Sequence, residues 1–272
     1  MKRIPTGIAL ALAALWIVKW APAALFWCVL VLVAVLVVEE LRRILARLGR
    51  PPWPVLAHFG TLATLGAFLL PGTPVAAVLA GILVLVFVRA LVPTQAPAEG
   101  LDRVVGTLLP VLYIGLTLGH LAGLFTPGQP PAARERGEDL MVLALCAVYI
   151  GDTFALCGGL LFGRHKLAPG ISPKKTWEGA VCGVVGALAS GWLAHVWFFQ
   201  ALPLAHALAL GGILGVAAIL GDLAESLLKR AATLKDSGAL FPGHGGMLDR
   251  VDSLLLAAPV LYWYHRLVLG GG

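Results

Sequence analysis

Residues 204–224 read LAHALALGGILGVAAILGDLA. The stretch is long enough to cross a membrane, because a helix needs about 20 apolar residues to span hydrocarbon roughly 30 Å thick. Its only carboxylate, Asp222, stands near the end of the run and directly follows Gly221. An ionised carboxylate at or near membrane depth is costly unless it has a partner. These residues therefore predict a membrane helix with a polar site at one end.

The composition extends this interpretation to the whole chain. Of the 272 residues, 59% are hydrophobic and 12% are charged, and the mean hydropathy is +0.91. Backbone polar groups in lipid must be satisfied internally, so these runs predict an all-α, polytopic transmembrane helical bundle. About nine spans are expected, at 7–20, 22–38, 53–71, 74–92, 104–125, 139–162, 177–199, 204–224 and 253–269.

The first of these segments allows two interpretations. Met1, Lys2 and Arg3 precede an apolar run that ends in the small residues 21–23, as in a cleaved signal peptide. A second apolar run, 24–38, follows at once and favours a retained helical hairpin. Because the first run is short, whether it fully spans the membrane is left open.

Basic residues are distributed unevenly between the loops. When alternate loops are placed on opposite sides of the membrane, sixteen of the 20 Lys and Arg residues fall on one side. The positive-inside rule makes that side cytoplasmic, together with the N-terminus. The net charge of +6 then reports topology, and no nucleic-acid partner is expected. The four cysteines lack CxxC spacing, so neither a disulfide framework nor a zinc site is expected.

A polar stripe continues out of the 204–224 run. Asp222, Glu225, Ser226 and Lys229 fall at i, i+3, i+4 and i+7, which places them on one face of a helix. A water-facing stripe would show the same spacing. Because Asp222 lies at or near membrane depth, it requires either a metal ion or a basic residue as partner.

Two further carboxylates begin the last apolar run. Asp249 and Asp252 are three residues apart and share a helix face. Together with Asp222 they offer oxygen ligands to a hard divalent cation, and Mg²⁺ needs only one or two carboxylates besides phosphates and water. The alternative is a structural role, in which they cap helices or pair with Arg230 or Arg250.

The segment between these aspartates contains Pro242-Gly243-His244-Gly245-Gly246. Its glycines let backbone N–H groups approach an anion closely. His244 could donate to a phosphate oxygen or carry a proton near neutral pH. A plain turn between two helices is the alternative interpretation.

A second polar loop, GRHKLAPGISPKKTWEG, occupies residues 163–179. Ser172, Lys174, Lys175 and Thr176 offer two cations and two hydroxyls before a helix N-terminus, where polyphosphates bind readily. The same lysines would also satisfy the positive-inside rule without further duty. The chain has no GxxxxGK[ST] and no GxGxxG motif, so neither a P-loop nor a Rossmann site is indicated.

One more carboxylate, Asp152, stands inside the apolar stretch 146–162. An intramembrane carboxylate is by default a candidate for a functional site. Lys175, Lys229 or Arg250 could pair with it, and a purely structural ion pair is the alternative.

Two sequence blocks resemble one known family. The stretch from Ser226 to Asp252 (SLLKR, KDSG and FPGHGGMLDRVD) resembles the signature of phosphatidate cytidylyltransferases, also called CDP-diglyceride synthases, and residues 163–179 are similar to the family's second block. The N-terminal third carries no matching motif. The chain departs from the pattern at residues 153–157, where small and aromatic residues are expected, and at Thr233, where glycine is expected.

The resemblance implies a membrane enzyme that makes CDP-diacylglycerol from CTP and phosphatidate with Mg²⁺, a second cation being possible. It also implies a homodimer in the inner or plasma membrane of a prokaryote, with the active site on the cytoplasmic side. A related lipid or isoprenoid nucleotidyltransferase or kinase would need similar residues. A cation-coupled transporter would place ionisable residues on several spans, whereas the first five spans hold almost none.

The residue chemistry and the resemblance together assign roles. Residues 1–72 are expected to form N-terminal transmembrane helices, and 73–272 a catalytic region with cytoplasmic loops 163–176 and 225–252. The predicted metal ligands are Asp222, Asp249, Asp252 and Asp152. The predicted catalytic residues are Asp222, Asp249, Lys235, His244 and Arg250. The predicted substrate-binding residues are Ser172, Lys174, Lys175, Thr176, Ser226, Lys229, Arg230, Gly245 and Gly246.

Overall fold

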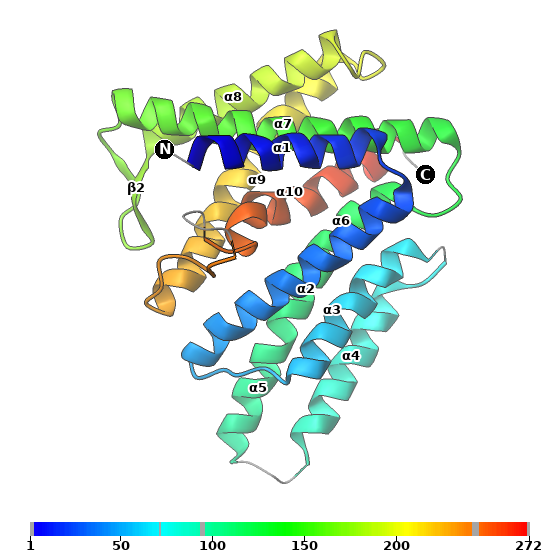
Figure 1. The fold of residues 1–272 in the computed structure, drawn as a ribbon, viewed down its shortest axis with the longest axis vertical. Coiled ribbons are helices and arrows are strands. Elements are labelled where there is room, and N and C mark those ends of the chain that lie inside the picture. Colours follow the sequence, from blue (N-terminus) through cyan, green and yellow to red (C-terminus); the bar gives the residue numbers. More distant parts are fainter. Residues whose placement is uncertain (1–2, 71, 93–95, 241–244, 271–272) are drawn as a thin grey trace. The chain divides into compact units, whose positions relative to one another are not determined.

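The computed structural model describes residues 3–70, 72–92, 96–240 and 245–270. The chain divides into two compact units. Unit 1 comprises Met1–Pro22, Pro130–Leu227 and Asp252–Gly272, and unit 2 comprises Ala23–Gln129 and Leu228–Val251. Figure 1 labels the elements along the chain.

Unit 1 is built on two helices, residues 131–162 and 177–196, that lie side by side (Figure 1). Its elements are α1 (Arg3–Trp20), α7 (Pro131–Phe162), β1 (Lys166–Ala168), β2 (Ser172–Thr176), α8 (Trp177–Val196), most of α9 (Leu204–Ala231) and most of α10 (Leu248–Leu267). Small residues let α7 and α8 approach closely, as is typical of membrane helices. A Cβ atom on Gly183 would lie 3.0 Å from the Cβ of Ala155 on α7. The two helices are also joined by a hydrogen bond of 3.2 Å that the Ser190 hydroxyl donates to the carbonyl of Cys146.

Unit 2 is a bundle formed mainly by the N-terminal half of the chain. Its elements are α2 (Ala23–Arg47), α3 (Pro54–Leu69), α4 (Val75–Ala90), α5 (Pro97–Pro110), the π-helical turn η1 (Val111–Leu116), α6 (Thr117–Ala122) and the 3₁₀ turn η2 (Gly123–Phe125). The last four follow one another without a break. Pro110 has no N–H and its ring crowds the preceding turn, which accounts for the change to a wider π-helical turn at Val111.

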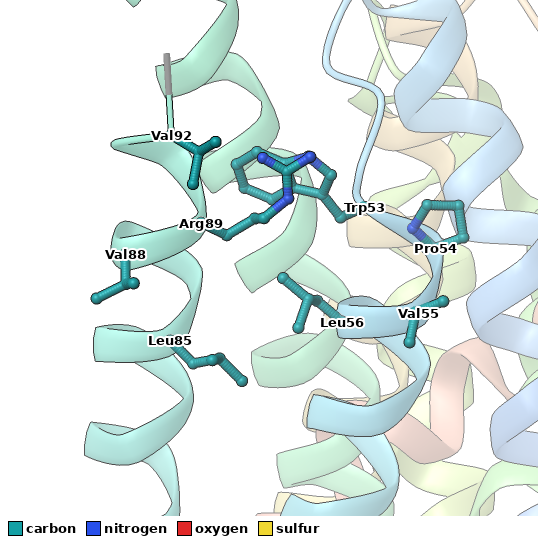
Figure 2. Close-up of a pocket in the computed structure, with 8 residues that line it drawn as sticks. All are labelled: Trp53, Pro54, Val55, Leu56, Leu85, Val88, Arg89 and Val92. Carbon is teal, nitrogen blue, oxygen red and sulfur yellow. The ribbon is translucent and has the colours of Figure 1, made fainter. Parts of the chain in front are cut away.

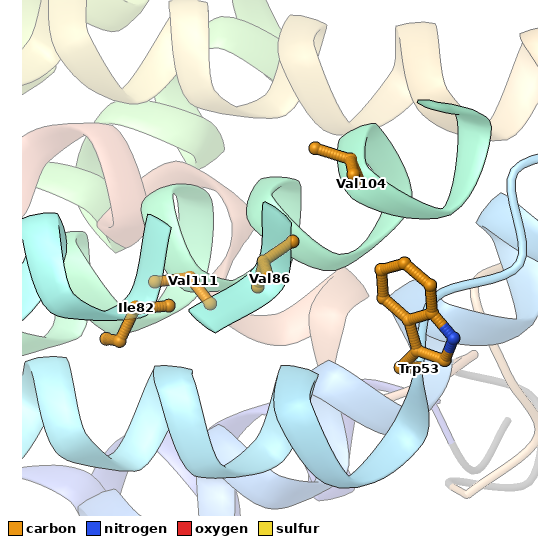
Figure 3. Packing of buried hydrophobic residues seen from close by; sticks show 5 residues of the cluster. All are labelled: Trp53, Ile82, Val86, Val104 and Val111. Atoms are coloured by element: carbon orange, nitrogen blue, oxygen red, sulfur yellow. The ribbon is translucent and has the colours of Figure 1, made fainter. Parts of the chain in front are cut away.

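A pocket of about 410 Å³ lies in unit 2 between α4 and the start of α3 (Figure 2). Beside it is a cluster of buried apolar side chains (Figure 3), formed by Trp53, Ile82, Val86, Val104 and Val111. Trp53 belongs to both, because it lines the pocket and packs in the cluster. Its backbone N–H donates to Thr107 Oγ1 at 3.0 Å, which ties the start of α3 to α5.

The prediction of an all-α membrane protein is confirmed, whereas the number of spans is not. Within the described ranges, the only strands are β1 and β2, which form an antiparallel hairpin inside the predicted loop 163–176. In the part of the chain that the structure describes, five segments are long and apolar enough to cross a membrane: Ala23–Arg47, Pro97–Phe125, Pro131–Phe162, Trp177–Val196 and Leu204–Ala231. Ala11–Trp20, Pro54–Leu69 and Val75–Ala90 are apolar but shorter, so a count of nine spans stays a prediction. The four cysteines are free, and Cys28 and Cys157 are exposed.

The end of α9 explains why a glycine was expected at position 233. Thr233 has φ 56°, in the left-handed region that glycine adopts at the C-terminal end of many helices. Its N–H donates to the Arg230 carbonyl at 3.0 Å, and the N–H of Leu234 donates to the Lys229 carbonyl at 2.8 Å. This Schellman-type cap therefore carries a β-branched residue in a conformation that is unfavourable for it.

We expect Thr233→Gly to stabilise the protein by about 1 kcal/mol, because the cap would keep its hydrogen bonds and lose the strain of a left-handed threonine. Unfolding in detergent, followed by circular dichroism, measures the change. Thr233→Ala is the matched control, since alanine keeps a Cβ atom and should give little of the gain. An equal gain from both variants would show that the hydroxyl or the side-chain bulk matters, and not the backbone conformation.

Candidate active site

The predicted site residues fall into two groups, one in each unit. Unit 1 contains Asp152, Ser172–Thr176, Asp222, Ser226 and Asp252, while unit 2 contains Lys229, Arg230, Lys235, Gly245, Gly246, Asp249 and Arg250. His244 lies outside the described residues.

Three carboxylates come together in unit 1. Asp222 and Glu225 from α9 and Asp252 from α10 each place an oxygen within 4.8 Å of the others. Gly221 permits this approach, because a Cβ atom at that position would lie 3.0 Å from the Cα of Ser253 on α10. Oxygen ligands at this spacing suit a hard divalent cation such as Mg²⁺. We call these three residues the acidic cluster.

A lysine from the hairpin contacts the acidic cluster. Lys175 Nζ on β2 lies 2.6 Å from Asp222 Oδ2, so Asp222 has the basic partner that its depth requires. The hydroxyl of Ser226 donates to the other oxygen of Asp222 at 3.3 Å. Asp152 on α7 interacts electrostatically with both Asp222 and Lys175. Three predicted metal ligands and two predicted substrate-binding residues are thus gathered in one place.

The hairpin that carries Lys175 is fixed at its base. Thr176 caps the N-terminus of α8, where its Oγ1 accepts a hydrogen bond of 3.2 Å from the N–H of Gly179. Glu178 accepts from the backbone N–H groups of Arg164 and His165, at 3.1 and 3.2 Å, and pairs with the ring of His165 at 2.6 Å. The predicted hydroxyl ligand Thr176 therefore has a structural role here.

The remaining hairpin residues differ in exposure. Ser172 is half-buried on β2, whereas Lys174 is exposed. Lys175, between Lys174 and the cap, is half-buried against Asp222. Of the two adjacent lysines, the structure brings only Lys175 to the acidic cluster.

In unit 2 the Asp249 carboxylate binds the segment that precedes it. Its Oδ1 pairs with Lys229 Nζ at 2.6 Å. Its Oδ2 accepts from the backbone N–H groups of Ser237 and Gly246, at 2.9 and 2.7 Å. Gly245 has φ +80°, and a Cβ atom there would clash with Asp249, which explains the need for glycine. Both Lys229 and Asp249 have almost fully buried side chains.

Glu40 on α2 joins this arrangement from the far end of the sequence. Its side chain is buried and accepts from the Ser237 hydroxyl at 2.9 Å and from the N–H groups of Met247 and Leu248, each at 2.8 Å. The last two N–H groups belong to the N-terminus of α10, where backbone donors have no partner within the helix and a nearby carboxylate is stabilising. The Ser237 hydroxyl also lies 2.8 Å from Asp249 Oδ2, so its one proton serves one carboxylate at a time.

The other basic candidates in unit 2 lie on the surface. Arg230, Lys235 and Arg250 are exposed. Arg230 donates from Nη1 to the carbonyl of Leu234 at 3.1 Å, which supports the cap at the end of α9. Their predicted roles toward phosphates stay predictions.

The sequence interpretation gave no role to two residues that the structure places at these sites. Glu225 lies on the predicted polar stripe, one turn from Asp222, and that spacing was the signal for its place in the acidic cluster. Glu40 gave no such signal. It closes an apolar run beside Glu39, and its partner Ser237 is 197 residues away.

Comparisons with known proteins find similarity to cytidylyltransferases. A family model described as "Cytidylyltransferase family" matches residues 1–268. A protein named phosphatidate cytidylyltransferase from Synechocystis sp. is 40% identical over 178 residues, which cover 60% of each chain. One from Thermotoga maritima is 31% identical over 194 residues, or 67% of each chain. Phosphatidate cytidylyltransferase 5, chloroplastic, from Arabidopsis thaliana is 43% identical over 162 residues, 60% of this chain and 39% of the relative. The chain spans about 40 to 60% of the length of the Arabidopsis and Synechocystis relatives.

We expect Glu40→Ala to destabilise unit 2 by about 3 kcal/mol, because each buried donor left without its acceptor costs about 1–3 kcal/mol. Glu40→Gln should cost less, since the amide keeps one acceptor oxygen. Unfolding in detergent gives the stability change. Hydrogen exchange at the amides of Met247 and Leu248 shows whether these two donors have been released.

Glu39→Ala is the matched control for this prediction. The neighbouring Glu39 pairs with Arg42 and Arg43 on a half-exposed face, at 2.7 and 3.1 Å, and its loss should cost about 1 kcal/mol or less. Similar costs and unchanged exchange at Met247 and Leu248 in both variants would contradict the proposed anchoring by Glu40.

Proposed function

Because this chain belongs to the cytidylyltransferase family, we propose that it makes CDP-diacylglycerol and pyrophosphate from CTP and phosphatidate. The names of its relatives support this reaction. The observation that carries the proposal is the acidic cluster with Lys175 at its side. Carboxylates that can hold a divalent cation, next to a lysine, suit a reaction in which two phosphate anions must be brought together and neutralised.

In the proposed reaction, a phosphate oxygen of phosphatidate attacks the α-phosphorus of CTP. The bond between the α-phosphorus and the bridging oxygen breaks, and its electron pair leaves with pyrophosphate. The nucleophile is already an anion, so no strong base is needed. The residues of this chain have to hold the two phosphates in line and offset the charge that develops on their oxygens.

The acidic cluster fits Mg²⁺ because its donors are all carboxylate oxygens at close range. When bound, Mg²⁺ would supply a positive charge that neutralises phosphate oxygens. We propose that Asp222, Glu225 and Asp252 hold it and that Asp152 supports them. A direct metal contact of Asp249 stays a prediction, as does a second cation at this centre.

Lys175 in unit 1 is the proposed phosphate ligand. Lys175 lies on Asp222 and would meet a phosphate that approaches the cluster. In unit 2, Asp249 and Glu40 accept hydrogen bonds from the backbone N–H groups of residues 237 and 246–248. We propose that these two carboxylates act by positioning this segment. Anion binding by Gly245 and Gly246 stays a prediction.

The membrane setting fits a lipid substrate. With apolar helices around the site, phosphatidate can enter sideways and keep its acyl chains in the bilayer. From the distribution of basic residues we propose that the site faces the cytoplasm. Assembly as a homodimer and location in a prokaryotic inner or plasma membrane stay proposals drawn from the family resemblance.

We expect purified protein in detergent to transfer radiolabel from α-labelled CTP, but not from γ-labelled CTP, into lipid when phosphatidate and Mg²⁺ are present. The α-phosphorus stays with the cytidine in the product, whereas the γ-phosphorus leaves as pyrophosphate. Label transferred from the γ position would indicate a kinase. A polyprenyl phosphate as the preferred acceptor would overturn the assignment to phosphatidate.

We expect Asp252→Asn to lower kcat by about 100-fold or more, because a preorganised charge in an active site is worth that much. The fold should be kept, since asparagine matches aspartate in shape. Asp102→Asn is the control, as Asp102 forms a half-exposed pair with Arg50 in unit 2. Near wild-type turnover by a folded Asp252→Asn protein over a range of Mg²⁺ concentrations would show that Asp252 is not a metal ligand.

A further inference from the structure

We propose that the pocket between α4 and the start of α3 binds an anionic phospholipid, with the lipid phosphate on Arg89 and an acyl chain along the aliphatic wall. The pocket is confined to unit 2 and shares no residue with either group of site residues. The inference therefore does not depend on the proposed reaction. Figure 2 shows Arg89 and Trp53 together, with aliphatic side chains below them.

Trp53 gives the pocket a rigid wall. Its side chain is buried in the cluster with Ile82, Val86 and Val104, and its backbone is held by Thr107. The guanidinium carbon of Arg89 lies 5.3 Å from the centre of the indole ring. A guanidinium stacked on an aromatic face keeps its N–H groups at the edge, in the planar geometry that binds phosphate through two hydrogen bonds.

The charge of Arg89 is not neutralised within the described part of the chain, where no carboxylate lies within ion-pair distance of its guanidinium. Arg103, on α5, likewise lacks such a partner but lies outside the pocket lining. Among the described residues that line the pocket, Arg89 is the only charged one, so an anion would find its counter-charge there.

The rest of the lining favours an acyl chain. Val55, Leu85 and Val88 line the pocket and are 79%, 43% and 56% exposed, in a helical protein that crosses a membrane. Such side chains are compatible with hydrocarbon and offer nothing to a free anion. An amphiphile with a negative head and an apolar tail matches both parts of this pocket.

The depth of Arg89 in the membrane also matches a phospholipid. Arg89 lies in the last turn of α4, a 16-residue helix that is apolar up to this point. Arginines near the end of a membrane helix reach the interface, which is the level of lipid phosphates. An interfacial anchor with no bound lipid would have the same position, so the test has to separate the two.

The test measures lipid binding by native mass spectrometry on delipidated protein in mild detergent. We expect phosphatidylglycerol to bind more tightly than phosphatidylcholine. Arg89→Gln should lower the affinity for phosphatidylglycerol by about tenfold, which is the size of one charge-assisted interaction. Arg103→Gln should leave the affinity unchanged. Leu85→Trp, which fills the pocket and keeps Arg89, should weaken binding as well.

Other results overturn the proposal. Equal weakening by Arg89→Gln and Arg103→Gln, or unchanged binding in Arg89→Gln, would mean that Arg89 acts only as an anchor. Equal affinities for phosphatidylcholine and phosphatidylglycerol would show that the charge of the lipid does not contribute to binding. Displacement of the lipid by millimolar inorganic phosphate would indicate an anion site that does not need the acyl chain. Cytidylyl transfer, measured in parallel, should persist in Arg89→Gln, so failure of this proposal is distinct from failure of the proposed reaction.

Discussion

An ionised carboxylate at membrane depth needs a positive partner, and unit 1 is arranged around that constraint. Asp222 comes at the end of an apolar run on α9, and β2 brings Lys175 to it at 2.6 Å. Glu225 and Asp252 place further oxygens within 4.8 Å of one another and of Asp222. Among these four residues Lys175 is the only cation, so the three carboxylates carry more negative charge than it neutralises. The hairpin, the cap at Thr176 and the Gly221 contact between α9 and α10 are all needed to bring these charges together.

Unit 2 uses carboxylates for a different purpose. Glu40 and Asp249 accept hydrogen bonds from the backbone of residues 237 and 246–248 and so fix the chain at these positions. Charged acceptors form stronger hydrogen bonds than neutral ones. The glycines are required by contact as well as by conformation, because a Cβ atom on Gly238 would lie 2.8 Å from an oxygen of Glu40.

Local periodicity and family motifs predicted those parts of the site that depend on short-range geometry. The stripe from Asp222 to Lys229 lies on one helix, α9, as its spacing indicated, and the expected glycine at Thr233 corresponds to a left-handed residue at the helix end. Glu40 could not be found this way, because its contacts join segments about 200 residues apart and leave no pattern in either one. The hairpin at 166–176 was likewise missed, since its two short strands lack the alternation that identifies longer ones.

The same two residue types, a carboxylate and a lysine, therefore have different consequences according to what else surrounds them. Lys229 and Asp249 are almost fully buried and pair with each other, and Asp249 also accepts from two backbone N–H groups, so their pair has mainly a structural effect. Lys175 and Asp222 are each about one quarter to one third exposed, and two more carboxylates lie close by. A partly exposed pair can exchange partners at low cost, whereas breaking a buried pair leaves an uncompensated charge. Of the two ion pairs, the one between Lys175 and Asp222 therefore costs less to open, as the proposed binding of a metal ion and a phosphate would require.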